Sequence, residues 1–282
     1  TGTGMDTYLE KYHIPAVDYS EGVKTAYPQG VQAKEFILPK ELLEQDCVIS
    51  LSKMKTHALE RITGAVKNSY GFVYGFHKAK GHTQYPSADS FARMLIDLNK
   101  CVAPKLYVMD GIVAMEGNGP GSGDPVPMNV LLMSTDPVAL DSVFSRLVYL
   151  KPEMVPTNYH GEKMGLGTWK EEEITLLTPD GEISMAEAVK KYGNPAFNVD
   201  RTEVRKNIWT RMAGALNIFQ KKPYIEADKC VRCGICVQSC PVPGKAVDFR
   251  KGKGKPPVYD YRKCIRCFCC QEMCPKKAIK VK

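Results

Sequence analysis

CVRCGICVQSCP at residues 230–241 and CIRCFCCQEMCP at residues 264–275 are two copies of one pattern, and they decide how the end of this chain folds. In each copy three cysteines recur at every third position, a fourth comes four residues later, and a proline closes the run. The repetition predicts that these cysteines act together as two sets of ligands.

The run C-x2-C-x2-C-x3-C-P is the bacterial two-cluster ferredoxin spacing, in which three thiolates of each run hold one [4Fe–4S] cluster and the fourth binds the other. We therefore expect two clusters. The predicted ligands are Cys230, Cys233, Cys236 and Cys274 for the first cluster, and Cys264, Cys267, Cys270 and Cys240 for the second. Because such clusters exchange single electrons, the runs predict a redox protein.

Other uses of these cysteines fit the spacing less well. Structural zinc prefers separated cysteine pairs, and a third cysteine at the same step has no role there. Disulfides are disfavoured between such close neighbours in a chain without a secretory segment. Cys269 is expected to be a spare thiol, because the register through Cys270 reproduces the first run. Cys47 and Cys101 are expected in the core, where free cysteines act as small hydrophobic residues.

Length and composition predict a protein of two domains in the cytoplasm. The chain has 282 residues, of which 44% are hydrophobic and 25% charged, and this length predicts about two domains. We expect no membrane span, since no apolar stretch reaches the ~18 residues of a spanning helix. With no visible signal peptide, a reducing cytoplasm is the expected compartment.

The positive charge is concentrated at the end of the chain. Residues 226–282 carry 14 of the 39 basic residues but 5 of the 31 acidic ones, a balance of +9 against −1 for the rest. A basic tail is often a nucleic-acid footprint, but no recognised binding motif accompanies this one. The negative charge of two clusters gives a simpler reason, so we expect no nucleic-acid partner.

Strand and helix signals alternate through the first part of the chain. They predict an α/β domain at residues 1–222, a sheet with covering helices, ahead of a small α+β ferredoxin-like two-cluster domain at 223–282. The expected strands are 35–38, 47–52, 106–109 and 130–133, and the expected helices are 39–45, 59–70, 87–101, 138–150 and 202–219. Ser87 or Asp89 is expected to cap helix 87–101, and Asp136, before Pro137, the next helix.

Basic side chains directly after the predicted strand 47–52 form a first candidate site. Ligands bind at the carboxyl ends of strands in open α/β sheets, where a following helix also offers its amide groups. The candidates are Lys53, Lys55, His57 and Lys67, which would hold a small acidic substrate or cofactor. A solvated basic loop is the plainer interpretation. His77 and His82 are weaker candidates.

A glycine-rich segment, residues 110–124, forms a second candidate site after the predicted strand 106–109. Its glycines permit close approach of the backbone to a ligand, and long loops are commonly functional. Asp110, Glu116 and Asp124 could then handle protons or a metal, and Glu116 is the one we expect in the site. The segment matches neither a dinucleotide-binding fingerprint nor a phosphate-binding P-loop.

The words LSKMKTH (51–57), ITGAVKN (62–68), MDGIVAMEGNGP (109–120) and TDPVALD (135–141) resemble domain-of-unknown-function family 362. The resemblance implies an α/β fold and a cytoplasmic, often anaerobic protein, with a two-cluster ferredoxin domain often at its C-terminus. Members usually have a further N-terminal strand, so we expect the α/β domain here to lack its N-terminal part. Residues 242–245 are an insertion relative to the second run, which we expect to change hydrogen bonding to the cluster sulfurs.

The leading functional hypothesis is an iron–sulfur oxidoreductase, in which two clusters relay electrons to a substrate or cofactor held by the α/β domain. The first alternative is a non-enzymatic electron carrier or redox-partner subunit whose α/β domain binds another protein. Cluster assembly or delivery is a further alternative. Each of the first two implies a redox partner protein.

Overall fold

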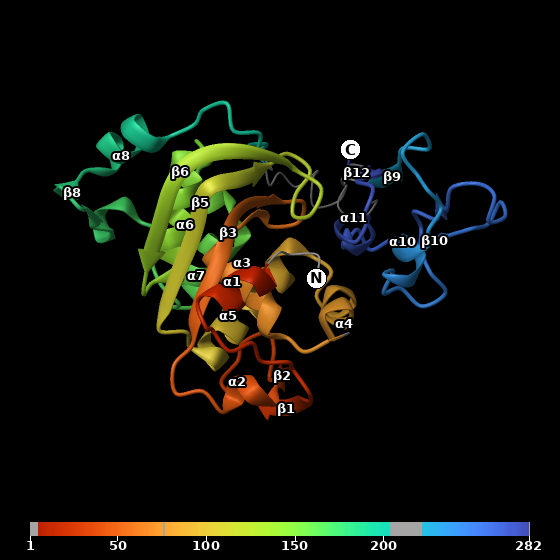
Figure 1. Cartoon of the computed structure of the whole chain (residues 1–282), viewed down its shortest axis with the longest axis horizontal. Coiled ribbons are helices and arrows are strands. Elements are labelled where there is room, and N and C mark those ends of the chain that lie inside the picture. The colour runs from red at the N-terminus through yellow and green to blue at the C-terminus, as the bar shows by residue number, and fades with distance from the viewer. Residues whose placement is uncertain (1–4, 76, 204–221, 282) are drawn as a thin grey trace, which may run out of the picture.

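A mixed sheet of four strands is the centre of the α/β part. The computed structural model describes residues 5–75, 77–203 and 222–281 (Figure 1). The strand order is β4-β3-β5-β6, with β3 and β5 parallel and both outer strands antiparallel to their neighbours. The bounds are β3 (Ile49–His57), β4 (Arg61–Thr63), β5 (Leu106–Glu116) and β6 (Asp124–Ser134).

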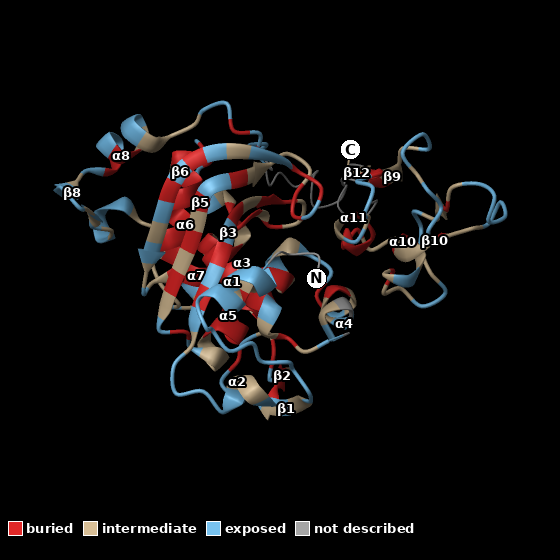
Figure 2. Ribbon diagram, in the orientation of Figure 1, coloured by how far each residue is buried: buried red, intermediate tan, exposed pale blue. Residues whose placement is uncertain are grey.

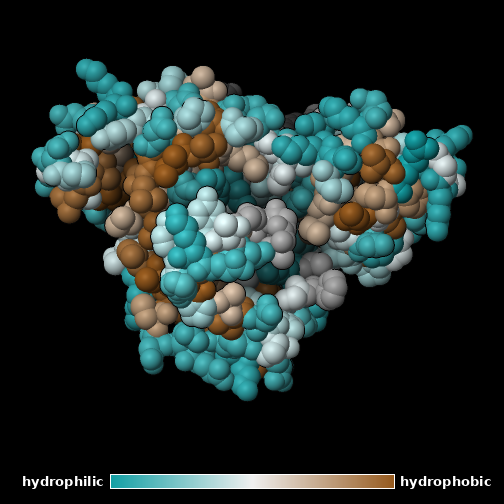
Figure 3. All heavy atoms as spheres, in the orientation of Figure 1, coloured by the Kyte–Doolittle hydropathy of each residue, from teal (hydrophilic) through white to brown (hydrophobic). Residues whose placement is uncertain are grey.

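Helices cover one face of this sheet, which confirms the predicted α/β class. They are α3 (Ala65–Asn68), α5 (Ala88–Val102), α6 (Pro137–Leu147) and α7 (Pro156–Lys163). Met54 and Met109 from the sheet are fully buried in one core with Phe144 of α6. The opposite face carries apolar side chains that none of these four helices covers, visible in brown in Figure 3, and Leu51 and Met133 are 71% and 62% exposed there.

Smaller elements surround this centre. An antiparallel hairpin of β1 (Gly22–Ala26) and β2 (Glu35–Pro39) lies at one end of the α/β part, and α4 (His77–Gln84) lies near the cysteine-rich part (Figure 1). The remaining elements are α1 (Met5–Lys11), α2 (Lys40–Leu43), β7 (Leu176–Thr178), β8 (Gly181–Ile183) and α8 (Met185–Tyr192).

Two helix starts predicted from sequence are confirmed. The Ser87 hydroxyl accepts the Ser90 amide at 3.1 Å and begins α5 as a capping box. The Asp136 carboxylate accepts the amides of Val138 and Ala139 and begins α6, with Pro137 in its first turn. Side-chain caps of this kind satisfy amides that have no partner inside the helix, which is why local sequence specifies them well.

Two expectations about the strands and loops are wrong. The strand predicted to end at residue 52 continues as β3 to His57, so Lys53, Lys55 and His57 lie in the strand and not after it. The glycine-rich segment 110–124 is mostly the paired ends of β5 and β6, with a turn at 117–123. β5 and β6 extend because each supplies backbone hydrogen-bond partners to the other. Local composition does not reveal such pairing.

Other differences follow from tertiary context. Residues 59–70, predicted as one helix, contain β4, α3 and the start of a short 3₁₀ helix (Ser69–Phe72). Cys47 is exposed, so its expected place in the core is wrong, and Cys101 is half-buried. The predicted helix 202–219 falls almost entirely outside the described residues. The domain boundary between residues 222 and 223 stays a prediction.

The cysteine-rich part, residues 222–281, is built from two similar halves. Its strands pair as β9 (Pro223–Ile225) with β12 (Ile279–Val281), and β10 (Val247–Asp248) with β11 (Val258–Tyr259). Each cysteine run contributes a short helix, α10 (Ile235–Gln238) and α11 (Cys269–Glu272). Figures 1 and 2 show α11 buried toward the α/β part and α10 on the far side.

The turn at residues 117–123, here called the glycine loop, forms hydrogen bonds with the cysteine-rich part. The side-chain amide of Gln271 in α11 donates to the carbonyl oxygens of Asn118 (2.7 Å) and Gly119 (3.0 Å). In return, the side-chain amide of Asn118 donates to the carbonyl oxygen of Ile279 in β12 at 3.0 Å. Hydrogen bonds in both directions therefore fix the two parts against each other.

Glycine is needed in this loop because its backbone lies against other backbone. A Cβ on Gly119 would collide with the carbonyl oxygen of Thr56 in β3, and one on Gly121 would lie 2.9 Å from that of Glu272. The close approach predicted for this segment is present, but the neighbour is the protein's own backbone and not a ligand.

We predict that Gly119→Ala destabilises the protein by about 1–3 kcal/mol, because the collision with Thr56 forces the glycine loop away from β3. Gly71→Ala is the matched control, since nothing lies within 4 Å of a Cβ at that position. Urea unfolding of the two variants measures the difference. Equal unfolding free energies for both would contradict the role given to Gly119.

Candidate functional site

Eight cysteines gather in two pockets of the cysteine-rich part. One pocket is lined by Cys230, Cys233, Cys236 and Cys274, and the other by Cys240, Cys264, Cys267 and Cys270. Each pocket takes three cysteines from one run and the fourth from the other run. The grouping is the one that the spacing leads us to expect, while the role of these residues as ligands stays a prediction.

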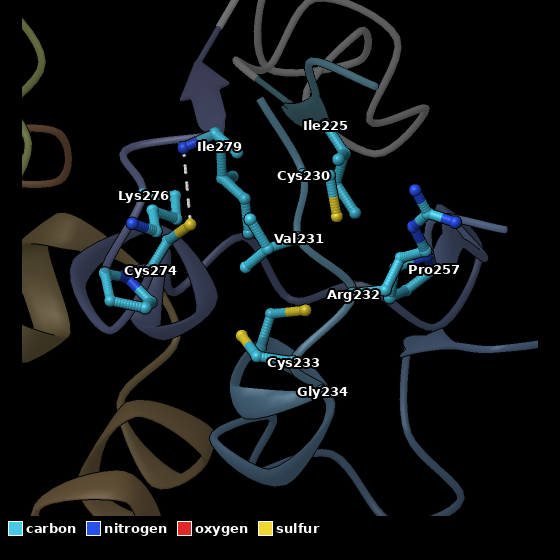
Figure 4. A pocket seen from close by; sticks show the side chains of 13 residues that line it. Ile225, Cys230, Val231, Arg232, Cys233, Gly234, Pro257, Cys274, Lys276 and Ile279 are labelled. Carbon is cyan, nitrogen blue, oxygen red and sulfur yellow. Dashed lines mark hydrogen bonds between the residues drawn. The ribbon is translucent and has the colours of Figure 1, made fainter. Parts of the chain in front are cut away.

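The shape and chemistry of the pockets fit a cluster of several iron atoms. Figure 4 shows the side chains of Cys230, Cys233 and Cys274 around one space, with apolar residues such as Ile225 and Ile279 completing the wall. Among the described residues, no three His, Cys, Asp or Glu side chains are arranged to hold a single ion. A cluster differs because each thiolate binds its own iron, so the sulfurs surround a larger volume than around zinc.

Backbone amides support one cysteine sulfur in each pocket. The Ala278 amide donates to Cys274 Sγ, drawn as a dashed line in Figure 4, and the Ala246 amide donates to Cys240 Sγ, both at 3.3 Å. The insertion 242–245 keeps this hydrogen bond, and whether it changes other hydrogen bonding to the cluster sulfurs stays a prediction. The second pocket has a further donor, since the Tyr259 hydroxyl lies 3.1 Å from Cys270 Sγ.

A buried histidine meets a carboxylate at the contact between the two parts. The side chain of His57 is fully buried, and its Nε2 lies 3.3 Å from Oε1 of Glu272 in α11. Its Nδ1 accepts the amides of Leu59 and Glu60, both at 3.1 Å, so the neutral ring carries its proton on Nε2. Burial, and then the Lys67 charge, lower the pKa of His57 to about 4.

Glu272 is ionised in this contact. Burial acts to raise its pKa, but the hydrogen bond from His57 and the charge of Lys67 outweigh burial and lower the pKa to about 2. A carboxylate from the cysteine-rich part thus lies among basic groups of the α/β part. We call Lys55, His57, Lys67, His82 and Glu272 the interdomain cluster.

Two lysines of the interdomain cluster form no ion pair among the described residues, and Lys67 Nζ lies 6.0 Å from the centroid of the Tyr70 ring. Lys55 of β3 and Lys67 of α3 are half-buried, and no hydrogen bond or ion pair to either ammonium is present within the described ranges. Burial, and then the Lys67 charge, lower the pKa of Lys55. Two cations that repel each other in a partly desolvated place favour an anion between them.

His82 is the fourth basic side chain that the fold brings here, and from the sequence it is one of the weaker candidates. It is 4% exposed, stacks on Phe91 with ring centroids 4.6 Å apart, and meets the edge of Tyr70 at 5.5 Å. Its Nδ1 is buried without a hydrogen-bond partner among the described residues. Burial lowers the pKa of His82 to about 4.

The structure also brings residues to this place that the sequence did not indicate. Glu272 and Tyr70 are two of them. Glu60 is fully buried with neither carboxylate oxygen bonded within the described part of the chain, and burial raises its pKa well above the ordinary value. Tyr70 packs against His82, and Glu272 follows Cys270 of the second pocket by two residues in α11, so its contact with His57 brings the interdomain cluster close to that pocket. No local pattern marks these residues, because their partners are distant in sequence.

Two predicted site residues lie elsewhere. Lys53 forms an ion pair with Asp110, Nζ to Oδ2 2.6 Å, on the uncovered face of the sheet. Glu116 accepts the Asn198 amide at 2.7 Å at the far end of β5. His77 is exposed at the start of α4. A pocket between the two parts is lined by His57, and neither Lys55 nor Glu116 lines it.

Cys269 lies beside the second pocket but does not line it. It is buried and interacts with the neighbouring Cys267 thiol, which lies in the pocket. The expectation that Cys269 is a spare thiol, one that binds no cluster, stays a prediction. Its position next to Cys267 sets it apart from a cysteine buried far from the pocket.

Comparison with known proteins identifies both parts of the chain. Residues 1–146, half of the sequence, match the family described as Domain of unknown function (DUF362). The chain belongs to the DUF362 family. Residues 222–275 match the 4Fe-4S dicluster domain, Fer4_10. The expected architecture of a DUF362 α/β part followed by a ferredoxin-like iron–sulfur domain is therefore confirmed, and the domain indicates a role in electron transfer.

One curated DUF362 relative of this chain is the Thylakoid-associated protein sll1697 of Synechocystis sp. It is 42% identical over 160 residues, which are 56% of this chain and 49% of the relative. The chain thus spans about half the length of the curated relative that it matches. No solved structure matches the chain. Among the described residues, no helix is long and apolar enough to cross a membrane.

We predict that His82→Phe makes this DUF362 protein more stable by about 1 kcal/mol at pH 7, because it removes a buried nitrogen without a partner and keeps the ring stacked on Phe91. The variant also changes the pH dependence. With a pKa near 6.5 unfolded and about 4 folded, the ring is protonated in the unfolded state first, so His82 lowers the stability of the wild type progressively as the pH falls from 6.5 toward 4.

Thermal unfolding at pH 7.5 and pH 5.5 tests this pH dependence. The loss of stability between the two values should be smaller in His82→Phe than in the wild type. His77→Phe, an exposed position on the same helix, serves as the control and should keep the full loss. A His82→Phe protein that is less stable at pH 7.5 would refute the prediction.

Proposed function

We propose that this protein is an iron–sulfur redox protein in which two [4Fe–4S] clusters relay electrons to a small anionic substrate or cofactor held at the interdomain cluster. The carrying observation is that eight cysteines form two pockets of four, and that Glu272, two residues after Cys270 of the second pocket, lies 3.3 Å from His57 of the strand that also carries Lys55. When bound, such clusters supply one-electron transfer.

The lysines support an acidic ligand. Both lysines are half-buried and neither ammonium has an ion-pair partner in the described structure, so an anion would gain charge-assisted hydrogen bonds that the protein does not already supply. The Glu272 carboxylate, 3.3 Å from His57, is an example of the kind of group that fits. Carboxylates and phosphates share this chemistry.

His57 supports proton handling next to the ligand. Its lowered pKa keeps the ring neutral at pH 7, and its two amide contacts fix the proton on Nε2. A neutral imidazole held in one tautomer can donate a hydrogen bond to an acceptor in a fixed direction. Lys53 and Glu116 have no part in this proposal, because their side chains are engaged elsewhere.

The first test concerns the cysteines. We predict that Cys230→Ser and Cys274→Ser each abolish the same cluster and halve the iron content, and that Cys240→Ser and Cys264→Ser each abolish the other. EPR of the reduced protein and iron analysis report which cluster is lost. Cys269→Ser, the control, should retain both. Loss of one and the same cluster on replacing Cys230 and Cys240 would refute the crossed assignment.

The second test concerns the lysines. We predict that Lys55→Met and Lys67→Met each raise the dissociation constant of an active anion at least about tenfold, since each removes a charge-assisted hydrogen bond. Lys53→Met, in the same strand but paired with Asp110, should have little effect. Phosphate and small dicarboxylates are the probes for binding, which calorimetry measures, and an unsaturated dicarboxylate, whose double bond can accept two electrons and two protons, is the oxidant in anaerobic re-oxidation of the dithionite-reduced protein.

A carrier without a substrate site gives a different result. In that case no probe anion is bound or reduced, and the variants at Lys55, Lys67 and Lys53 behave alike. Variants that keep the wild-type absorption spectrum exclude loss of folding as the cause. Such an outcome would leave the cysteine assignment intact and remove the anion site from the proposal.

A further inference from the structure

The two cysteine runs form an internal comparison, because equal spacing lets each residue of one run be matched with a residue of the other. In the second run the segment 266–271 is buried against the α/β part. In the first run the matched residues Arg232 and Cys233 are exposed, and the following ones are mostly half-buried. Among the eight cysteines of the two pockets, Cys233 is the one that is exposed.

The exposure is a consequence of docking on one side. Gln271 and Glu272 in α11 contact the α/β part, whereas α10, which contains their counterparts Val237 and Gln238, lies on the far side of the cysteine-rich part (Figure 1). The first pocket is thus the one that another protein can approach. Contact there would bring a partner next to a cysteine of the pocket with no intervening layer of protein.

The rim of the first pocket is basic. Arg232 is exposed, and its Nη1 donates to the Gly254 carbonyl at 2.8 Å, which brings the exposed Lys253 and Lys255 to the same side. Lys276 is exposed and lines the pocket directly (Figure 4). Two acidic residues lie nearby in sequence, Glu226 and Asp228. Glu226 forms an ion pair with Lys229 at 2.7 Å. The four basic side chains of the rim therefore outnumber Asp228, the other acidic one.

We propose that this rim, formed by Val231, Arg232, Cys233, Lys253, Lys255 and Lys276, is the docking surface for an acidic redox protein that exchanges electrons with the chain. The proposal rests on the proposed function in that the pocket behind the rim holds a cluster. Complementary charge steers encounter and fixes orientation. An exposed apolar residue, Val231 at 55%, and a cysteine at the centre favour a protein partner over nucleic acid, since neither contributes to phosphate binding.

Charge reversal on the rim tests the proposal. The probe is an acidic flavodoxin, and the protein is the reconstituted full chain. Arg232→Glu with Lys276→Glu should weaken flavodoxin binding at low salt at least about tenfold, and raised salt should abolish the difference. Lys105→Glu with Lys191→Glu changes the net charge equally at exposed positions of the α/β part and should change binding less than about twofold.

A kinetic measurement separates docking from damage to the pocket. The rim variant should be reduced more slowly by flavodoxin hydroquinone but at the wild-type rate by dithionite, which needs no docking. Equal weakening by the rim and control variants would overturn the proposal, because binding would then follow net charge alone. Binding of duplex DNA or anionic vesicles in preference to flavodoxin would also overturn it.

Failure of flavodoxin to dock at the rim can be told apart from failure of the proposed function. If the chain takes up no clusters, iron analysis reports it before any flavodoxin is added. If the clusters are present but no anion binds at Lys55 and Lys67, the proposed function loses its substrate site, while flavodoxin binding at the rim is still measured independently.

Discussion

The contact of α11 with the glycine loop is the constraint on which the rest of this structure depends. The Gln271 amide satisfies two loop carbonyls that would otherwise be buried without a donor, so breaking the contact costs more than the bonds themselves. Once Gln271 is fixed, the next residue, Glu272, is directed at His57, and the cysteines before it are covered. One backbone-directed contact thus decides both which pocket is buried and which side chains meet its edge.

The polar and charged groups at this contact lower the stability of the folded protein. His82 has a buried nitrogen and Glu60 two buried oxygens without partners among the described residues, and Lys55 and Lys67 repel each other. A core selected for stability alone would replace such groups with apolar ones. Natural sequences break local rules mainly where function requires it, so this concentration of unsatisfied polar atoms beside a cysteine pocket supports a ligand-binding role.

Local patterns predicted the parts of this fold that local chemistry controls. The caps at Ser87 and Asp136 and the two groups of four cysteines follow from residues a few positions apart, together with the known crossing of the fourth thiolate. Partners distant in sequence could not be read this way. The extension of β3 to His57 needs β4 and β5 beside it, and the meeting of His57 with Glu272 joins residues 215 positions apart. Lys53 is the opposite case. The sequence predicts it in the site, but its ammonium forms an ion pair with Asp110 on β5 and so lies outside it.

The difference in exposure between the two pockets also sets an order of damage. Thiol oxidation follows accessibility, so oxygen and peroxide reach Cys233 well before the buried Cys267. If the proposed function and the proposed docking surface both hold, air would damage the cluster that receives electrons first, and the cluster near His57 and the lysines later. A preparation handled without strict anaerobic care would then still bind the proposed anion but would no longer reduce it.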